Sequence, residues 1–199
     1  DELAYVGVGP RRNFRARRWW DPLASRRDPT GPIPIEALSP LRALAPSLEF
    51  WRRRHELAAV LTAGAAIRDA ARVNGYDLWP VLEQELIGTA LLQWPWSARA
   101  MDEAGAALDR LAPDVVLTYA EAGGWGRALV LEARRRGVPS VGIQHGFIYR
   151  HWLNYLHEPD EWTRVGDDPG VPAPDRTLLF DRYAAQHLYT AGAFPGEAL

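Results

Sequence analysis

The sequence predicts an α/β protein with a mostly parallel sheet and a helical insertion at residues 47–111. Three observations carry this prediction. Two apolar strand patterns flank a helix pattern between Val115 and Gln144. Such a succession within about thirty residues is typical of a parallel, right-handed crossover unit. Apolar residues recur at helical spacing across 47–111, and another strand and helix pattern covers 177–191.

Composition narrows the class of protein. The chain has 199 residues, of which 47 % are hydrophobic and 24 % charged, and we predict one globular domain, 1–199. The net charge of −2 argues against nucleic acid as a partner. The absence of cysteine excludes disulfides and thiolate nucleophiles. No apolar run is long enough for a membrane span and no signal-peptide pattern is present, so we expect a cytoplasmic protein.

The N-terminal region predicts a short strand followed by an irregular arm. Leu3–Gly9 alternates as a strand and ends in glycine, and residues 10–46 are rich in proline and arginine. A short helix is expected near Ile35–Leu44. The Trp19-Trp20 pair among arginines makes this arm a candidate for peripheral contact with a membrane surface. The start without methionine suggests that the chain is trimmed from a longer one.

The insertion predicts three helices. Apolar residues at helical spacing indicate one long amphipathic helix over Leu48–Val73, which Asn74-Gly75 ends. Pro80 suits the first turn of a second helix running to about Gln93. A third helix is expected over Ser97–Leu111.

The second half of the chain has the clearest pattern. Val115–Tyr119 is an apolar, β-branched strand, and Ser140–Gln144 is a second one. Between them lie the glycine-rich turn Glu121–Gly126 and the helix Arg127–Arg136, which Gly137 and a following proline end. A strand at Thr177–Phe180 and a helix at Asp181–Ala191 come last.

Two loops are predicted to meet at a ligand-binding edge. Ligands of open parallel sheets bind beyond the carboxyl ends of the strands. Those ends are followed by Glu121–Arg127 and by Gln144–Tyr149, and the Gly9–Arg12 loop is a third contributor. The first two loops are therefore the candidate site.

The glycine-rich loop allows two interpretations. Gly123 and Gly124 allow backbone to approach a ligand, and they lie where helix amides carry partial positive charge. Arg127 adds a cation in the first turn, where it opposes the helix dipole, so binding of phosphate or carboxylate would explain it. The alternative is a tight strand-to-helix turn with a solvated arginine.

His145 is the strongest catalytic candidate, because it follows a strand directly and precedes Gly146. A neutral imidazole there can accept a proton from a sugar hydroxyl or donate to phosphate, although a lone histidine is more often structural. Glu121 could orient it or act as the base. His145, His151 and His157 lie six apart, a spacing that does not match a helical pair of metal ligands, so we predict no metal.

Three stretches carry a resemblance to a known family: Pro113–Val116, Gly137–Gly146 with its Gln-His-Gly turn, and Thr177–Pro195. On them, about eighty residues from Ala112 resemble the N-terminal domain of GT-B-type glycosyltransferases of bacterial surface-polysaccharide assembly. Related arrangements occur in glycerophosphotransferases and nucleotide-sugar 2-epimerases. The resemblance implies a Rossmann-like domain, one half of a GT-B architecture.

The resemblance also implies an activity. The chain would be the acceptor-binding half of an enzyme that moves a sugar from a nucleotide sugar to a polysaccharide or lipid-linked acceptor, at the inner face of the membrane. His145 and Glu121 would be catalytic, and the sugar or phosphate-bearing acceptor would be held by residues of both loops: Gly123, Gly124, Arg127, Gln144, Gly146 and Tyr149.

The donor half is absent by the same reasoning. The nucleotide sugar would bind a C-terminal domain that this chain lacks, so the chain itself is expected to hold no cofactor and to be inactive alone. Two alternatives stay open. One is a nucleotide-sugar epimerase or hydrolase-like domain, and the other is a non-catalytic α/β binding module.

Overall fold

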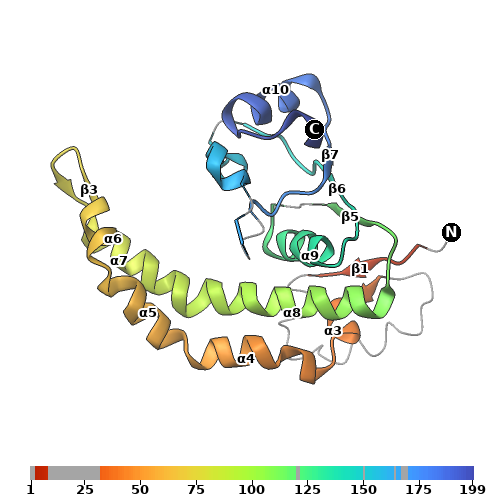
Figure 1. Ribbon diagram of the computed structural model, residues 1–199, viewed down its shortest axis with the longest axis horizontal. Coiled ribbons are helices and arrows are strands. Elements are labelled where there is room, and N and C mark those ends of the chain that lie inside the picture. Colours follow the sequence, from red (N-terminus) through yellow and green to blue (C-terminus); the bar gives the residue numbers. More distant parts are fainter. Residues whose placement is uncertain (1–2, 9–31, 120–121, 150, 164, 167–169) are drawn as a thin grey trace.

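The computed structural model describes residues 3–8, 32–119, 122–149, 151–163, 165–166 and 170–199. It is an α/β protein whose described strands form one three-stranded and two two-stranded sheets. A body carries the larger sheet, and a long helical arm extends away from it (Figure 1). The predicted α/β class with short parallel sheets is confirmed.

The N-terminal strand is confirmed but short. β1 (Val6–Gly7) pairs in parallel with β2 (Ile33–Pro34), which lies in a segment predicted to be irregular. The helix expected near Ile35–Leu44 is present in two pieces, α3 (Ile35–Leu38) and the 3-10 helix η2 (Leu41–Leu44). Pro40 explains the break, because the residue before a proline avoids helical angles and Ser39 is extended. The Arg-rich stretch up to residue 31, with the Gly9–Arg12 loop and the Trp19-Trp20 pair, lies outside the described residues.

The single long helix predicted at Leu48–Val73 is wrong. The chain forms three helices there, α4 (Ala45–Arg52), α5 (Arg54–Ala63) and α6 (Ala65–Ala70). Gly64 takes an extended conformation (φ −68°, ψ 110°), which breaks the helix between α5 and α6. Glycine is the residue that stabilises a helix interior least among those other than proline, so a bend is favoured there.

A hairpin ends the arm. β3 (Arg72–Val73) and β4 (Tyr76–Asp77) pair antiparallel around Asn74-Gly75, whose φ angles of 51° and 83° are those of a two-residue hairpin turn. The helix predicted to reach Val73 ends at Ala70, so its predicted end is wrong. The same Asn-Gly pair also turns the chain back toward the body.

The next two predicted helices are joined without a gap, so the separation predicted between them is wrong. α7 (Trp79–Gly88) runs through the π-helical turn η3 (Thr89–Gln93) into α8 (Trp94–Leu111). Pro95 lacks an amide hydrogen and would disturb an α-helical ladder. The wider π turn directly before it accommodates that loss, because it shifts the hydrogen-bond pattern at this point.

The crossover unit is confirmed. β5 (Val116–Tyr119), α9 (Gly124–Arg135) and β6 (Ser140–Ile143) follow one another, and β5 pairs in parallel with β6. β7 (Arg176–Leu178) adds to the other side of β6, also in parallel, and α10 (Arg182–Ala191) follows it. The strand order is β5-β6-β7, so all three carboxyl ends lie at one edge.

The two faces of this sheet differ. Val116 and Thr118 of β5 are buried, and Val116 packs with Ala133 of α9. On the other face Leu117 and Leu178 are 57 % and 58 % exposed. α9 therefore covers one face, and the alternating apolar residues of the other face lie at the surface of the described chain.

A buried carboxylate joins α8 to α9. Glu103 is fully buried, accepts hydrogen bonds from Arg99 Nε (2.8 Å) and Trp125 Nε1 (2.9 Å), and pairs with Arg99. Close by on α8, Gly105 lets the helices approach, because a Cβ there would lie 3.1 Å from side-chain atoms of Glu132 and Arg136. The bond from Trp125 fixes the start of α9, and with it the turn that precedes the helix, whereas the close approach at Gly105 fixes the end of α9.

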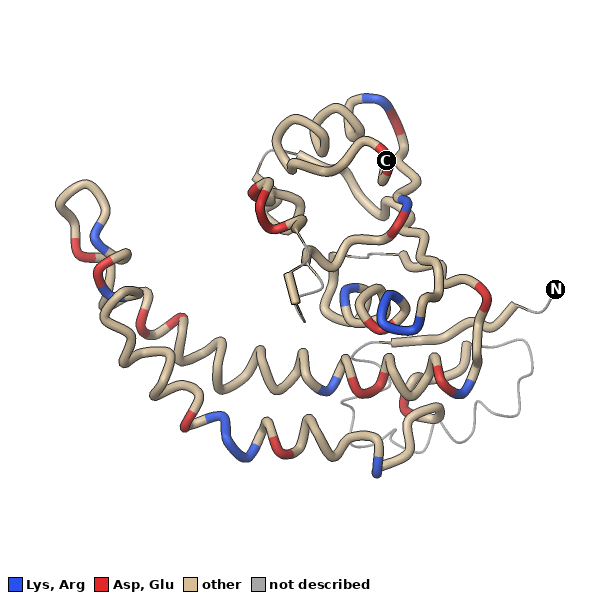
Figure 2. Tube along the Cα trace, viewed as in Figure 1, with Lys and Arg blue, Asp and Glu red and all other residues tan. Residues whose placement is uncertain are grey.

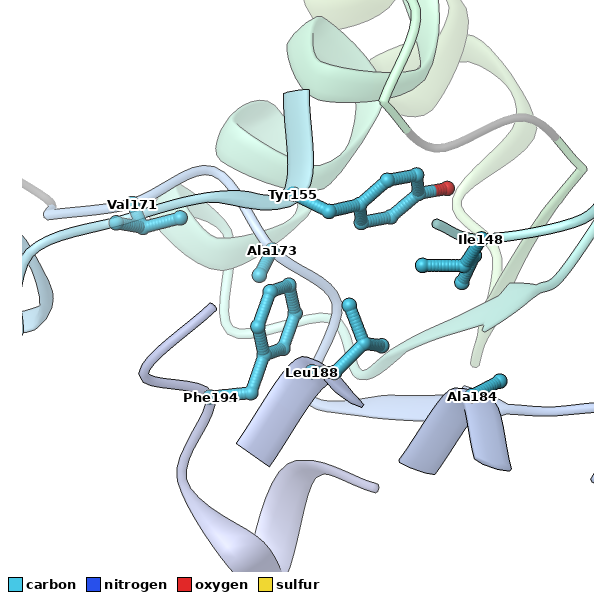
Figure 3. Close-up of a cluster of buried hydrophobic side chains, with 7 residues drawn as sticks. All are labelled: Ile148, Tyr155, Val171, Ala173, Ala184, Leu188 and Phe194. Atoms are coloured by element: carbon cyan, nitrogen blue, oxygen red, sulfur yellow. The ribbon is translucent and has the colours of Figure 1, made fainter. Parts of the chain in front are cut away.

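The apolar core beside the sheet edge is drawn in Figure 3. Tyr155, Leu188 and Phe194 point toward one another between the loop after β6 and α10 (Figure 3), and each is at most 5 % exposed. Asp181 caps the start of α10, because its carboxylate accepts a hydrogen bond from the amide of Ala184 (2.8 Å). This core holds α10 against the loop that carries the candidate site.

Candidate functional site

The carboxyl ends of the parallel strands bring together most of the predicted loop residues. His145 follows β6, and Tyr119 is the last residue of β5. The Tyr119 hydroxyl donates to the His145 carbonyl oxygen (3.2 Å), and the two rings meet edge to face at 5.5 Å. Glu121, predicted to be catalytic, lies outside the described residues.

Gln144 sets the course of the backbone on either side of His145. Its side chain is buried, its Nε2 donates to the Gly146 carbonyl (2.7 Å), and its Oε1 accepts from the Phe180 amide (2.8 Å). The sequence-based prediction assigned Gln144 to substrate binding. The structure shows its amide used within the protein, where it ties the loop after β6 to the loop after β7 and so positions His145.

His145 itself lies among aromatic rings. Its imidazole is half-buried, and the rings of Tyr119 and Trp152 meet it edge to face at 5.5 Å and 5.4 Å. Its Nδ1 is buried and has no hydrogen-bond partner among the described residues. A buried polar atom without a partner costs free energy, and a ligand, a water molecule or a reaction step that uses the atom would explain it.

The glycine-rich turn is the N-terminal end of α9. Gly123 is the N-cap residue and Gly124 the first helical residue, so the helix begins three residues before the predicted start at Arg127. A Cβ on Gly124 would meet no atom within 4 Å. Backbone amides at the start of a helix attract anions, and the open space in front of Gly124 leaves room for one.

Substitution of Gly124 tests whether the space in front of this residue is empty in the folded protein. We expect Gly124→Ala to leave the melting temperature unchanged or to raise it, because alanine stabilises a helical position by about 0.5–1 kcal/mol relative to glycine. Gly192→Ala is the contrasting control. It should lower the melting temperature, because its Cβ would overlap the Tyr155 carbonyl oxygen. Thermal unfolding measures both. A marked fall in the melting temperature for Gly124→Ala would show that the space is filled in the folded protein.

Arg127 links the two loops. Its Nη2 donates to the Asn154 carbonyl (2.9 Å), so the guanidinium joins the first turn of α9 to the loop after β6. The side chain is half-buried, so part of the group faces solvent at the helix start. The Arg127 guanidinium opposes the helix dipole at this position, and the carbonyl oxygen of Asn154 helps to hold it there.

The pKa of His157 is lowered by burial and by the charge of Arg127. Burial and the positive charge of Arg127 lower the pKa of His157, against a smaller opposite effect of Glu161, whose carboxylate lies 3.5 Å from Nδ1. A histidine whose pKa is lower when folded is neutral in the native state but takes up a proton more readily when unfolded. We therefore expect stability that is fully present above pH 6.5 and is lost as the pH falls from there toward the folded pKa.

Thermal unfolding across about pH 5–8 checks this expectation. His157→Gln should flatten the part of the melting-temperature profile that falls below pH 6.5. His55→Gln, at an exposed position of α5, should leave the profile as it is. A profile that keeps its full slope in His157→Gln would contradict the assignment.

Two ring-bearing residues of the site, Tyr183 and His187, lie outside the predicted loops. They join Phe147 and Tyr149 of the predicted second loop in a series of near-parallel rings at the same edge. Tyr183 and His187 are four residues apart on α10, so they share a helix face. The sequence did contain a signal for these rings, namely two ring-bearing residues four apart on a helix that directly follows a strand.

A hollow also lies away from the strand ends. A groove of about 640 Å³ runs between η2, α8 and the end of α9. Its charged side chains largely neutralise one another, since Arg136 pairs with Asp109 and Glu132, and Arg135 pairs with Glu132. The hydrogen bond from Arg136 lowers the pKa of Asp109. We therefore place the candidate site at the strand ends, where the buried Nδ1 of His145 has no partner within the described chain.

Comparisons with known proteins do not assign the chain to a family. No family model, curated protein or solved structure matches the chain. Within the described ranges, no three histidine, aspartate or glutamate side chains lie together as a metal site would need. None of the described helices combines the length and apolar character required to cross a bilayer. The function is therefore argued from the site alone.

Proposed function

We propose that the chain is the acceptor-side, Rossmann-like domain of a GT-B-type glycosyltransferase that acts in surface-polysaccharide assembly. The observation that carries the proposal is the edge at which β5, β6 and β7 end. Among the described residues, it brings into one place a histidine with an unpaired buried nitrogen, the start of α9 and a set of exposed rings. In parallel α/β sheets this edge is where ligands bind.

The proposed reaction is a displacement at the anomeric carbon of a nucleotide sugar. An acceptor hydroxyl oxygen forms a bond to that carbon, and the bond from the carbon to the nucleotide phosphate breaks. The hydroxyl proton passes to the imidazole of His145, which acts as general base. The phosphate leaves with the bonding electrons, so charge balances between the protonated histidine and the released nucleotide.

The start of α9 supports the phosphate in this proposal. Its first amides and the half-buried guanidinium of Arg127 carry positive charge toward the same edge. The two hydrogen bonds of Gln144 fix the backbone on either side of His145. The Trp152 ring packs close to Gly146, since a Cβ at this position would lie 3.5 Å from it. The nucleotide sugar would bind mainly to a second domain of the same enzyme.

Product analysis tests the proposal. The native protein that contains this domain is incubated with labelled nucleotide sugars, with and without a saccharide acceptor, and the products are separated. Label transferred to the acceptor with release of nucleotide supports a glycosyltransferase. Label that stays on the nucleotide as an epimerised sugar, formed without acceptor, would replace the proposal with the epimerase alternative. Unchanged nucleotide sugar in both arms would contradict both.

A further inference from the structure

A row of aromatic rings, of which three are exposed and one is half-buried, runs along the edge beside His145. In spatial order it consists of Tyr149, Phe147, Tyr183 and His187, which we call the aromatic platform. The ring centroids are 6.5, 6.1 and 6.3 Å apart and the planes differ by 19°, 13° and 6°. The platform joins the loop after β6 to α10.

Three rings of the platform are open to solvent. Phe147, Tyr149 and Tyr183 are 67 %, 46 % and 58 % exposed. Large apolar surface that is grouped and left in water marks a binding site more often than singly exposed residues do.

We propose that the aromatic platform binds the apolar face of a neutral saccharide. A pyranose ring has one face of C–H groups and a rim of hydroxyls. The platform offers flat apolar faces, with the hydroxyls of Tyr149 and Tyr183 as polar edges, and such rings suit a ligand that is apolar on one side and wet on the other.

Charge favours a neutral ligand over a nucleotide or a phosphate. The platform holds no arginine, and α10 carries an arginine only at its first position, Arg182, next to the acidic cap Asp181 (Figure 2). A phosphate-bearing ligand on these rings would meet no concentrated positive charge from α10. A second cation of the described part of this edge, Arg127, lies at the start of α9.

The platform leads toward His145. The ring centroids of Tyr149 and Trp152 are 6.2 Å apart, and those of Trp152 and His145 are 5.4 Å apart. A saccharide lying along the four rings would therefore extend away from the imidazole, as the body of an acceptor chain would. This placement rests on the proposed function, whereas binding of a saccharide to the rings does not require that any transfer occurs.

Calorimetric titration of the chain tests the platform. The probes are neutral hexasaccharides of glucose, mannose, rhamnose and N-acetylglucosamine. At least one should bind, and Tyr183→Ala and Phe147→Ala should each weaken it about tenfold, a typical effect of removing a stacked ring. Tyr189→Ala is the matched control, because Tyr189 lies on the same helix, is 62 % exposed and has no ring contact among the described residues. Tyr76→Ala, in the hairpin at the far end of the arm (Figure 1), is a second control.

The outcomes are distinct. Equal affinity of Tyr183→Ala and Tyr189→Ala, or no binding of any probe, would overturn the proposal. Self-association of the chain that Tyr183→Ala abolishes would assign the platform to a second copy instead, and would overturn it as well. Saccharide binding that depends on the platform, in a native protein that transfers no sugar, would keep the platform and refute only the proposed function.

Discussion

His145→Ala is expected to lower sugar transfer by the native protein about 10²–10⁴-fold, the usual contribution of a general base. The acceptor hydroxyl would lose the group that takes its proton, while the platform that binds the acceptor stays in place. Turnover should therefore fall far more than acceptor affinity. The transfer assay measures kcat and KM with the acceptor as the varied substrate.

Two controls make this result specific. His55→Ala removes an exposed imidazole of α5 and should leave transfer unchanged. The melting temperature of His145→Ala should fall by only a few degrees, because the variant loses the edge-to-face contacts of the imidazole but keeps the bond from the Tyr119 hydroxyl to its backbone. Near-normal turnover in a folded His145→Ala protein would remove His145 from the mechanism.

Glu103→Ala is expected to destabilise the protein by about 3 kcal/mol, because it breaks a buried ion pair with Arg99 and removes the acceptor of Trp125 Nε1. Arg99 is 32 % exposed in its side chain and reaches water in part, which keeps the cost near the lower end for such pairs. For a chain of this length the melting temperature should fall by about 6–12 °C.

Glu103→Gln is the matched variant. It keeps the size of the side chain and one acceptor oxygen for Trp125 Nε1, whereas its NH2 group faces the Arg99 donors, so the bonds to Arg99 are lost and we expect a smaller cost than for Glu103→Ala. Denaturant unfolding of the parent and both variants measures the difference. If Glu103→Ala and Glu103→Gln were equally stable, the hydrogen bond to Trp125 would contribute nothing to the packing of α8 on α9.

The fold could be predicted where local pattern and tertiary structure agree. β5, α9 and β6 are bounded by glycine and proline and are rich in apolar residues, so their place along the chain was predictable. The helical arm was not predictable in detail. A glycine inside an amphipathic pattern is compatible with a continuous helix or with a break, and at Gly64 the chain breaks.

The site was predictable to the level of its loops. The rule that ligands bind at strand ends placed His145 and the start of α9 at one edge, as the parallel strand pairs show. The use of Gln144 within the protein was hidden, because its partner Phe180 lies 36 residues further along the chain. The rings of α10 were missed for the same reason, since only the third strand brings them beside Phe147.

Nitrogen-15 NMR of the histidine side chains tests the central claim that this strand edge binds an acceptor at His145. The chain has 5 histidines, so the ring signals can be assigned one by one through single substitutions. On titration with a saccharide that binds, we predict that the ring nitrogens of His145 shift and those of His55 do not. A saturating saccharide that leaves both ring nitrogens of His145 unchanged would contradict the claim.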